Sequence, residues 1–188
     1  MNEATSLMNH FLIAMPALDD PNFFHTVTYI FQHDERGAMG IVINRETDVS
    51  LGEVFSQLGF EWPDDNRITD RRVFLGGPVD NERGFIIHSP VGEWDSSFKV
   101  TDDLAVTTSK DMLLAMSENH MPDRVLVALG YAGWGAGQLE NEMMANAWMS
   151  GPADLDIIFD LPVDERWQAA ATHLGVDLSR LSNDIGHA

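Results

Sequence analysis

The sequence predicts an α+β fold, in which helices flank a mixed β-sheet core that is accompanied by a smaller two-layer α/β part. Short runs of β-branched and aromatic residues recur along the chain, and helical patterns separate some of them. Strands and helices do not alternate regularly, which favours a mixed sheet over a parallel one. A chain of 188 residues with 44% hydrophobic content buries about 70% of its unfolded surface without a metal or a disulfide. We therefore expect one domain over residues 1–188.

Three strands are expected near the amino terminus. The apolar run Phe11–Met15 ends at a proline and is typical of a buried strand. Phe24–His33 and Ala38–Asn44 are rich in β-branched and aromatic residues, and the turn residues of Asp34–Gly37 separate them. This spacing predicts a β-hairpin.

The middle of the chain predicts two capped helices and several short strands. Ser50 and Glu53 have capping-box spacing, which predicts a helix over Leu51–Leu58. Thr108 and Asp111 have the same spacing and predict a second helix after them. The acidic segment Glu61–Asp70 is expected to be a loop. Four short runs are expected to be strands, namely Val73–Leu75, Gly84–His88, Phe98–Val100 and Leu104–Thr107.

A glycine-rich segment is the most distinctive local feature. The apolar run Val125–Leu129 is expected to be a strand that breaks into a turn at Gly130–Gly137, where four glycines surround Tyr131 and Trp134. Neither the P-loop nor the dinucleotide-binding fingerprint fits these glycines, and no lysine or arginine lies among them. Two helices are expected after the turn, over Leu139–Ala147 and from Pro162 to a cap at Gly175.

Charge is the strongest global constraint on function. Thirty acidic residues against 11 basic ones give a formal net charge of −19. Binding to DNA depends on lysine and arginine neutralising phosphates, so direct contact with nucleic acid or with an anionic membrane is not expected. Three arginines cluster in sequence among aspartates, and we expect a solvated loop in which these charges compensate one another. The arginines are Arg67, Arg71 and Arg72, and the aspartates are Asp64, Asp65 and Asp70.

Cysteine is absent, which excludes disulfides and thiol catalysis and fits a reducing cytoplasm. The apolar run Phe11–Leu18 has no basic residue before it and is too short to cross a membrane, so we interpret it as a strand rather than a signal segment. No HExxH motif and no GxSxG motif occurs. We therefore expect a cytoplasmic protein without a metal, a cofactor or a recognisable catalytic centre.

Two glycine segments are candidate sites. Tyr131 and Trp134 in the first segment either pack structurally over a turn or serve as exposed aromatic anchors for a partner. The second segment, Gly76-Gly77-Pro78-Val79, permits positive φ or close backbone approach.

Polar residues near the second segment suggest an alternative chemistry. Arg83 is suited to clamping an anion and His88 to moving protons, although each is also typical of a structural role. Asn44 and Arg45 end a predicted strand, where binding side chains often project. If these four residues form a site, they should converge in one cleft.

Nine motifs, taken in order, give the chain a resemblance to a known family. They are FLIAMP at Phe11–Pro16, DPNF at Asp20–Phe23, GAMGIVINR at Gly37–Arg45, GGPV at Gly76–Val79, RGFIIH at Arg83–His88, LGYAGW at Leu129–Trp134, GQLE at Gly137–Glu140, NAW at Asn146–Trp148 and GHA at Gly186–Ala188. This series resembles the YqgE/AlgH family of bacterial proteins. One departure is Glu46, where that family usually places proline after the Asn-Arg pair.

The resemblance implies a compact fold with a central sheet flanked by helices and a smaller two-layer part. It implies no catalytic residues. Some family members are named as transcriptional regulators of exopolysaccharide synthesis, but this chain has no helix-turn-helix signature.

We therefore expect a non-enzymatic binding or regulatory protein that acts through protein partners. One alternative is a transcriptional regulator that contacts DNA. The other is an enzyme or a binder of small anions that uses Arg45, Arg83 and His88. The sequence leaves the oligomeric state and the identity of any ligand open.

Overall fold

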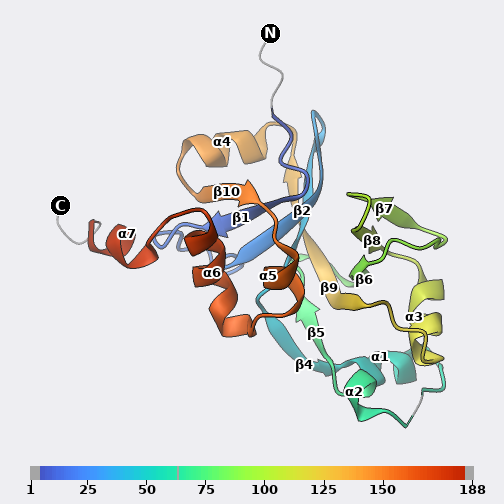
Figure 1. Ribbon diagram of the computed structural model, residues 1–188. Coiled ribbons are helices and arrows are strands. Elements are labelled where there is room, and N and C mark those ends of the chain that lie inside the picture. Colours follow the sequence, from blue (N-terminus) through green and yellow to red (C-terminus); the bar gives the residue numbers. More distant parts are fainter. Residues whose placement is uncertain (1–4, 63, 185–188) are drawn as a thin grey trace.

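A computed structural model describes residues 5–62 and 64–184, and in these residues a ten-stranded sheet curls into a half-barrel with helices against it (Figure 1). The closing motif of the family resemblance, at 186–188, lies outside the described residues. The elements are β1 (His10–Ala14), β2 (Val27–Asp34), β3 (Gly37–Val42), β4 (Glu46–Ser50), α1 (Leu51–Gln57), α2 (Asn66–Thr69), β5 (Arg72–Leu75), β6 (Val79–Ser89), β7 (Ser97–Lys99), β8 (Ala105–Thr107), α3 (Lys110–Ser117), β9 (Arg124–Gly135), α4 (Gln138–Met144), β10 (Trp148–Pro152), α5 (Leu155–Phe159), the 3-10 turn Val163–Glu165, α6 (Arg166–His173) and α7 (Leu178–Asp184).

Strand β9 is the centre of the sheet. The strand order is β10-β1-β2-β3-β9-β6-β8-β7, and β5 joins it by pairing in parallel with β9 while β4 pairs with β5. All other pairings are antiparallel. The predicted α+β class with a mixed sheet is confirmed.

Three apolar clusters hold helices against the sheet. The largest fills the inside of the curl and includes Tyr29, Phe31 and Phe85, with Ile158 of α5 and Ala171 of α6 packed on it. The second lies between the sheet and α1, α2 and α3, and forms the expected smaller α/β part around β4 and β5. The third lies under α4. The α5–α6 layer and the β4–β5 pair therefore approach each other across the start of β9 (Figure 1).

Several local predictions are confirmed. The first strand forms as β1, and β2 and β3 form the hairpin, in which Asp34 pairs with Gly37. The capping box is present in both directions, since the Ser50 side chain accepts from the Glu53 N–H and Glu53 accepts from the Ser50 N–H. Gly175 has φ +79° and follows the end of α6, as expected of a C-terminal cap.

The glycine-rich turn was predicted wrongly, because the segment Gly130–Gly135 continues β9. Pairing with β3 covers Gly135 to Ala132, so hydrogen bonding to neighbouring strands outweighs the low strand propensity of glycine. Gly133 leaves space that the ring of Tyr131 fills. Helix α4 follows after two residues, with Gly137 in the left-handed conformation.

Other corrections concern elements without strong local signals. The second capping box is wrong: the residue before the helix is Ser109, and neither it nor Thr108 caps the helix by a side-chain bond. Asp65 caps a short helix, α2, inside the expected loop. The polar link before Gly84 belongs to β6, and β4, β10 and α7 were not predicted.

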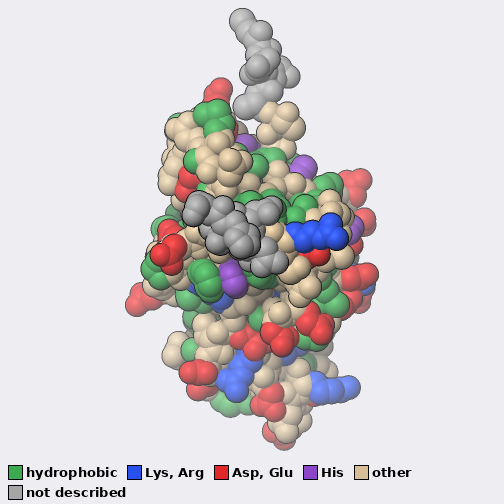
Figure 2. All heavy atoms as spheres, turned by 90° about the vertical axis from the view of Figure 1, so that its left-hand side faces the viewer, with side chains coloured by type: hydrophobic (Ala, Val, Ile, Leu, Met, Phe, Trp, Pro, Cys, Tyr) green, Lys and Arg blue, Asp and Glu red, His purple; other side chains and the backbone are tan. Residues whose placement is uncertain are grey.

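No helix among the described residues is long and apolar enough to span a bilayer. Figure 2 shows acidic side chains spread over the face that carries α6, while the few basic side chains visible there lie apart from one another.

Candidate functional site

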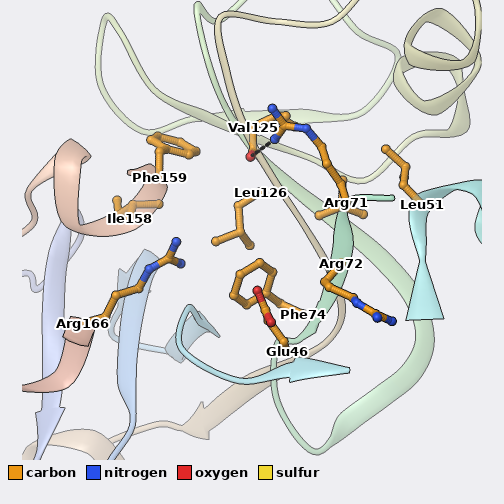
Figure 3. Close-up of a pocket in the computed structure, with 11 residues that line it drawn as sticks. Glu46, Leu51, Arg71, Arg72, Phe74, Val125, Leu126, Ile158, Phe159 and Arg166 are labelled. Carbon is orange, nitrogen blue, oxygen red and sulfur yellow. Dashed lines mark hydrogen bonds between the residues drawn. The ribbon is translucent and has the colours of Figure 1, made fainter. Parts of the chain in front are cut away.

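A cavity of about 180 Å³ lies between the α5–α6 layer and the β4–β5 pair (Figure 3). It collects three of the 11 basic residues of the chain, and we call it the arginine cavity. Its lining residues are Glu46, Leu51, Arg71, Arg72, Phe74, Val125, Leu126, Val127, Ile158, Phe159 and Arg166.

Arg166, the first residue of α6, lies at the inner wall of this cavity and is only 5% exposed. Its Nε donates to the carbonyl of Leu161 at 3.0 Å and its Nη1 to the carbonyl of Ile43 at 2.6 Å. The guanidinium carbon lies 5.3 Å from the centre of the Phe74 ring. The remaining nitrogen, Nη2, makes no hydrogen bond within the described residues and points with the guanidinium into the cavity (Figure 3).

The charge of Arg166 is therefore buried without an ion pair among the residues that the structure describes. Burial lowers the pKa of Arg166, and the charges of Glu46 and Asp160 partly offset this. A buried charge is usually paired, because its transfer from water is costly. Arg166 is an exception to this rule among the described residues.

Arg71 and Arg72 lie on the opposite side of the cavity, where the chain enters β5. Arg71 donates to the carbonyl of Val125 at 3.4 Å, and Arg72 points away from Phe74 and donates to the carbonyl of Asp48 at 2.8 Å (Figure 3). The prediction of a self-compensated loop holds for Arg67, which pairs with Asp65 at 3.0 Å.

For Arg71 and Arg72 that prediction is wrong, since neither forms an ion pair within the described residues. Both side chains are exposed, as expected, but they donate to backbone carbonyls of distant segments, Val125 and Asp48, instead of to the aspartates of the loop.

The rest of the wall is apolar except for Glu46. Phe74, Leu126, Ile158 and Phe159 form a hydrocarbon surface beside the guanidinium of Arg166 (Figure 3). On α5, next to this wall, Asp156 and Asp160 are held by Arg124 at 3.2 and 3.4 Å.

The lining contains no histidine, serine, threonine, cysteine or lysine. The arrangement can therefore hold an anionic head against arginine with an apolar body beside it, and Glu46 is the one lining residue that could act as a base or a nucleophile. No cluster of potential metal ligands occurs in the described part of the chain.

The residues singled out in the sequence lie elsewhere. Asn44 is structural: its Oδ1 accepts from the Val27 N–H and its Nδ2 donates to the carbonyl of His25, both at 2.9 Å. Arg45 donates to the carbonyls of Asn22 at 2.6 Å and Phe24 at 3.0 Å. Burial lowers the pKa of Arg45.

Arg45 and Gly77 do share a second, separate hollow of about 260 Å³. Gly76 and Gly77 provide close backbone approach, since a Cβ on Gly76 would overlap the carbonyl of Gly130 and one on Gly77 the backbone of Tyr131.

His88 is a buried, hydrogen-bonded residue of β6. Its Nδ1 donates to the carbonyl of Pro90 at 2.9 Å, so its Nε2 accepts from the hydroxyl of Thr107 at 2.6 Å in the neutral ring. Burial lowers the pKa of His88, and the Pro90 carbonyl partly opposes this shift. Arg83 is exposed and lies over the ring of Phe85, with its guanidinium carbon 5.3 Å from the ring centre.

The expected convergence of these four polar residues is wrong. His88 pairs with Val125 of β9, whereas Val79, next to the second glycine segment, pairs with Tyr131. Six residues of strand separate the two positions, which is about 20 Å. This distance exceeds direct hydrogen-bond cooperation.

Of the two alternatives for Tyr131 and Trp134, the structure shows packing rather than exposed anchors. Trp134 is 6% exposed and packs with Phe23 and Trp148, at ring-centre distances of 6.0 and 6.1 Å. Tyr131 is half-buried against Phe85 at 5.3 Å. Both residues face cores because β9 continues through this segment instead of turning outward.

Arg166 was not among the predicted site residues, although its helical spacing relative to the apolar residues after it is visible in the sequence. Ala170 lies one helical turn after Arg166 and is buried, so i,i+4 spacing places the arginine on the core face of α6. Arginine is seldom fully buried unless it is paired, so an arginine on the core face of a helix is expected to have a specific partner.

Comparison with known proteins gives a consistent result. The model of the AlgH-like family matches residues 11–179. A UPF0301 protein of Thioalkalivibrio sulfidiphilus is 57% identical over 188 residues, which cover 100% of both chains. The solution structure of the AlgH protein from Pseudomonas aeruginosa, also a UPF0301 protein, is 46% identical, covers 100% of both chains and has a TM-score of 0.80.

A crystal structure from Corynebacterium diphtheriae is 19% identical with a TM-score of 0.75, covers 97% of this chain and 94% of that one, and shows the shared fold alone.

Proposed function

The chain belongs to the AlgH-like family, and on this premise we propose that it is a non-enzymatic binding protein whose ligand is a small anion held in the arginine cavity. The names of its relatives carry no activity, so the proposal rests on the site. The observation that carries it is the guanidinium of Arg166, which is buried, aimed into a cavity and without an ion pair in the described residues.

The local charge outweighs the net charge of −19. An anion about 4 Å from one guanidinium gains about 4 kcal/mol at the effective dielectric constant of a protein surface, against about 1 kcal/mol in water. Carboxylates beyond the Debye length of about 8 Å are screened by physiological salt. Within that range the lining carries three arginines, Arg71, Arg72 and Arg166, against one carboxylate, Glu46, so the local balance of charge favours an anion.

The size of the cavity limits the ligand. At about 180 Å³, it holds the volume of about six water molecules and is smaller than the roughly 300–1,000 Å³ of typical pockets for drug-sized ligands. A phosphate or a small carboxylate fits these limits, and a carboxylate with a short hydrocarbon body also matches the wall of Phe74, Leu126 and Phe159. A nucleotide does not fit.

Isothermal titration calorimetry with inorganic phosphate and with benzoate tests the proposal. The wild type is compared with Arg71→Gln, which removes an exposed cationic wall residue, and with Arg67→Gln, an exposed arginine nearby that is paired with Asp65 outside the cavity. We expect Arg71→Gln to weaken binding about tenfold or more, because a charge-assisted hydrogen bond is lost. Arg67→Gln should bind like the wild type.

Failure of the wild type to bind either anion would refute the proposal. An equal loss in Arg71→Gln and Arg67→Gln would also contradict it, since that result reflects general surface charge rather than the cavity.

A second candidate function is recognition of a protein partner, favoured by a different surface. Phe24 is 47% exposed and Leu75 is 37% exposed, and both flank Arg45. The Arg45 guanidinium donates to the carbonyl of Phe24, and the Arg45 carbonyl accepts from the N–H of Leu75. Exposed apolar residues grouped around a hollow are typical of interaction surfaces.

A pull-down with Phe24→Ser/Leu75→Ser as bait tests this candidate. Leu114→Ser, which changes an exposed leucine on α3, is the matched control. We expect a partner recovered by the wild type and the control to be lost from the double variant, and its retention would contradict the candidate.

A further inference from the structure

Glu46 is the only carboxylate in the lining of the arginine cavity. It is the first residue of β4 and pairs in register with Phe74 of β5. The guanidinium of Arg166 lies over the ring of Phe74. Figure 3 shows the Glu46 carboxylate pointing toward Phe74, on the side from which Arg166 also approaches. The register of β4 with β5 therefore places a negative group of the chain beside the position proposed for an external anion.

Resting on the function proposed above, we infer that Glu46 is an internal competitor for the cavity, an anion built into the chain that lowers the affinity of Arg166 for an external one. The two negative groups would share one guanidinium in one small cavity. Like charges at such short range disfavour each other, so an arriving anion must displace the Glu46 carboxylate or bind beside it.

Glu46 is suited to displacement because it is attracted but not fixed. Its charge acts on Arg166, opposing the effect of burial on the pKa of that arginine. It forms no ion pair and no side-chain hydrogen bond within the described residues, and its side chain is exposed. An exposed side chain changes rotamer on the picosecond to nanosecond timescale. The competitor can therefore leave without any movement of the backbone.

Two aspartates near the cavity, Asp156 and Asp160, are not competitors for the site, and two arginines there, Arg72 and Arg124, form no ion pair with Glu46 within the described residues. Arg124 holds Asp156 and Asp160 on α5, so these carboxylates are already paired. Arg72 is directed to the carbonyl of Asp48, away from Phe74. Glu46 remains the unpaired negative group that faces Arg166.

Calorimetric titration with inorganic phosphate separates this inference from the proposed function. The variants are Glu46→Gln, which keeps the shape of the side chain, Glu46→Asp, which keeps its charge but shortens it, and Glu82→Gln. The last is an exposed residue of β6 outside the lining, and its substitution makes the same change in net charge. Urea unfolding of each variant verifies that it is folded.

We expect Glu46→Gln to bind phosphate about two- to five-fold more tightly than the wild type, the size of effect that a solvent-accessible charge pair produces. Glu46→Asp should lie between the two, and Glu82→Gln should match the wild type.

Unchanged or weaker binding by Glu46→Gln, with a wild type that binds, would overturn the inference and leave the proposed function standing. Equal tightening in Glu46→Gln and Glu82→Gln would overturn it as well, because net charge alone would then explain the change. If neither the wild type nor Glu46→Gln binds phosphate or benzoate, both are overturned.

Discussion

The guanidinium carbon of Arg166 lies 5.3 Å from the centre of the Phe74 ring. This contact joins α6 to β5, two elements whose first residues are 94 positions apart in the chain (166 − 72) and which belong to different parts of the molecule. The same guanidinium donates to the carbonyls of Leu161 and Ile43. Arg166 thus has a structural role in addition to the proposed binding role, and the two can be separated by experiment.

Arg166→Lys is expected to destabilise the fold by about 1–3 kcal/mol while keeping the positive charge. An ammonium on a flexible stem cannot donate to both carbonyls and also lie flat over Phe74, as the planar guanidinium does. A buried carbonyl left without its donor costs this amount. Urea-induced unfolding measures the change. Arg67→Lys, at an exposed position outside the core, should stay within about 0.5 kcal/mol of the wild type, and equal midpoints for the two variants would contradict the structural role.

Gly77→Ala is expected to destabilise the protein by about 3 kcal/mol or more. A Cβ at Gly77 would overlap the backbone of Tyr131 and Ala132 in β9, and backbone atoms in a paired strand cannot move aside as a side chain does. Gly84→Ala in β6 is the matched control, because a Cβ there meets nothing within 4 Å. Thermal unfolding followed by circular dichroism compares the two. Similar melting temperatures of the two variants would contradict the interpretation that Gly77 is required for the close approach of its backbone to β9.

Local signals in the sequence predicted local structure well. The capping box at Ser50 and the hairpin turn at Asp34–Gly37 depend on residues within a few positions of each other, and both formed. The course of β9 through Gly130–Gly135 depends on β3, about 95 residues earlier in the chain, and the sequence pattern carries no sign of that pairing. Strand β4 has the polar sequence ETDVS and lies at a half-exposed position, so it has no apolar run to detect.

The candidate site was less predictable than the fold, because it is made from contacts between distant segments. Arg71 was identified as one of the few cations, but its neighbours in sequence are acidic while its neighbour in space is the carbonyl of Val125. Arg166 and Glu46 are 120 residues apart (166 − 46), and only the folded chain brings them to one cavity. The net charge of −19 gives no sign of the cavity in which Arg71, Arg72 and Arg166 gather.

Helix α4 carries two glutamates whose pKa values shift in opposite directions. Burial raises the pKa of Glu142, and the charge of Asp20 adds to this while a hydrogen bond from Trp134 opposes it. The Oε2 of Glu142 is buried without a partner in the described residues. Backbone hydrogen bonding lowers the pKa of Glu140, helped by the side chain of His33, whose Nε2 lies 2.7 Å from the carboxylate.

Glu142→Gln is expected to stabilise the protein at pH 7. A raised folded-state pKa means that the folded chain binds more protons than the unfolded chain, so stability falls as the pH rises from the unfolded pKa of about 4.3 toward the folded value. The neutral amide does not carry this penalty. Urea midpoints at pH 7 and near pH 3 measure the difference, and the advantage of the variant should vanish at the lower pH, more than one unit below the unfolded pKa of about 4.3, where the glutamate is protonated in both states.

Glu140→Gln should show the opposite sign on the same helix, which makes it the control for general effects of removing a negative charge. A lowered folded-state pKa contributes stability that is present above the unfolded pKa and is lost as the pH falls through the folded value. The variant should therefore lose about 0.2–1 kcal/mol at pH 7, the range measured for exposed pairs, because the Glu140 side chain is 39% exposed although His33 is buried, and it should lose little at low pH. If both variants shift the midpoint in the same direction at pH 7, the net charge of −19 rather than the local surroundings of each carboxylate controls the stability of this helix.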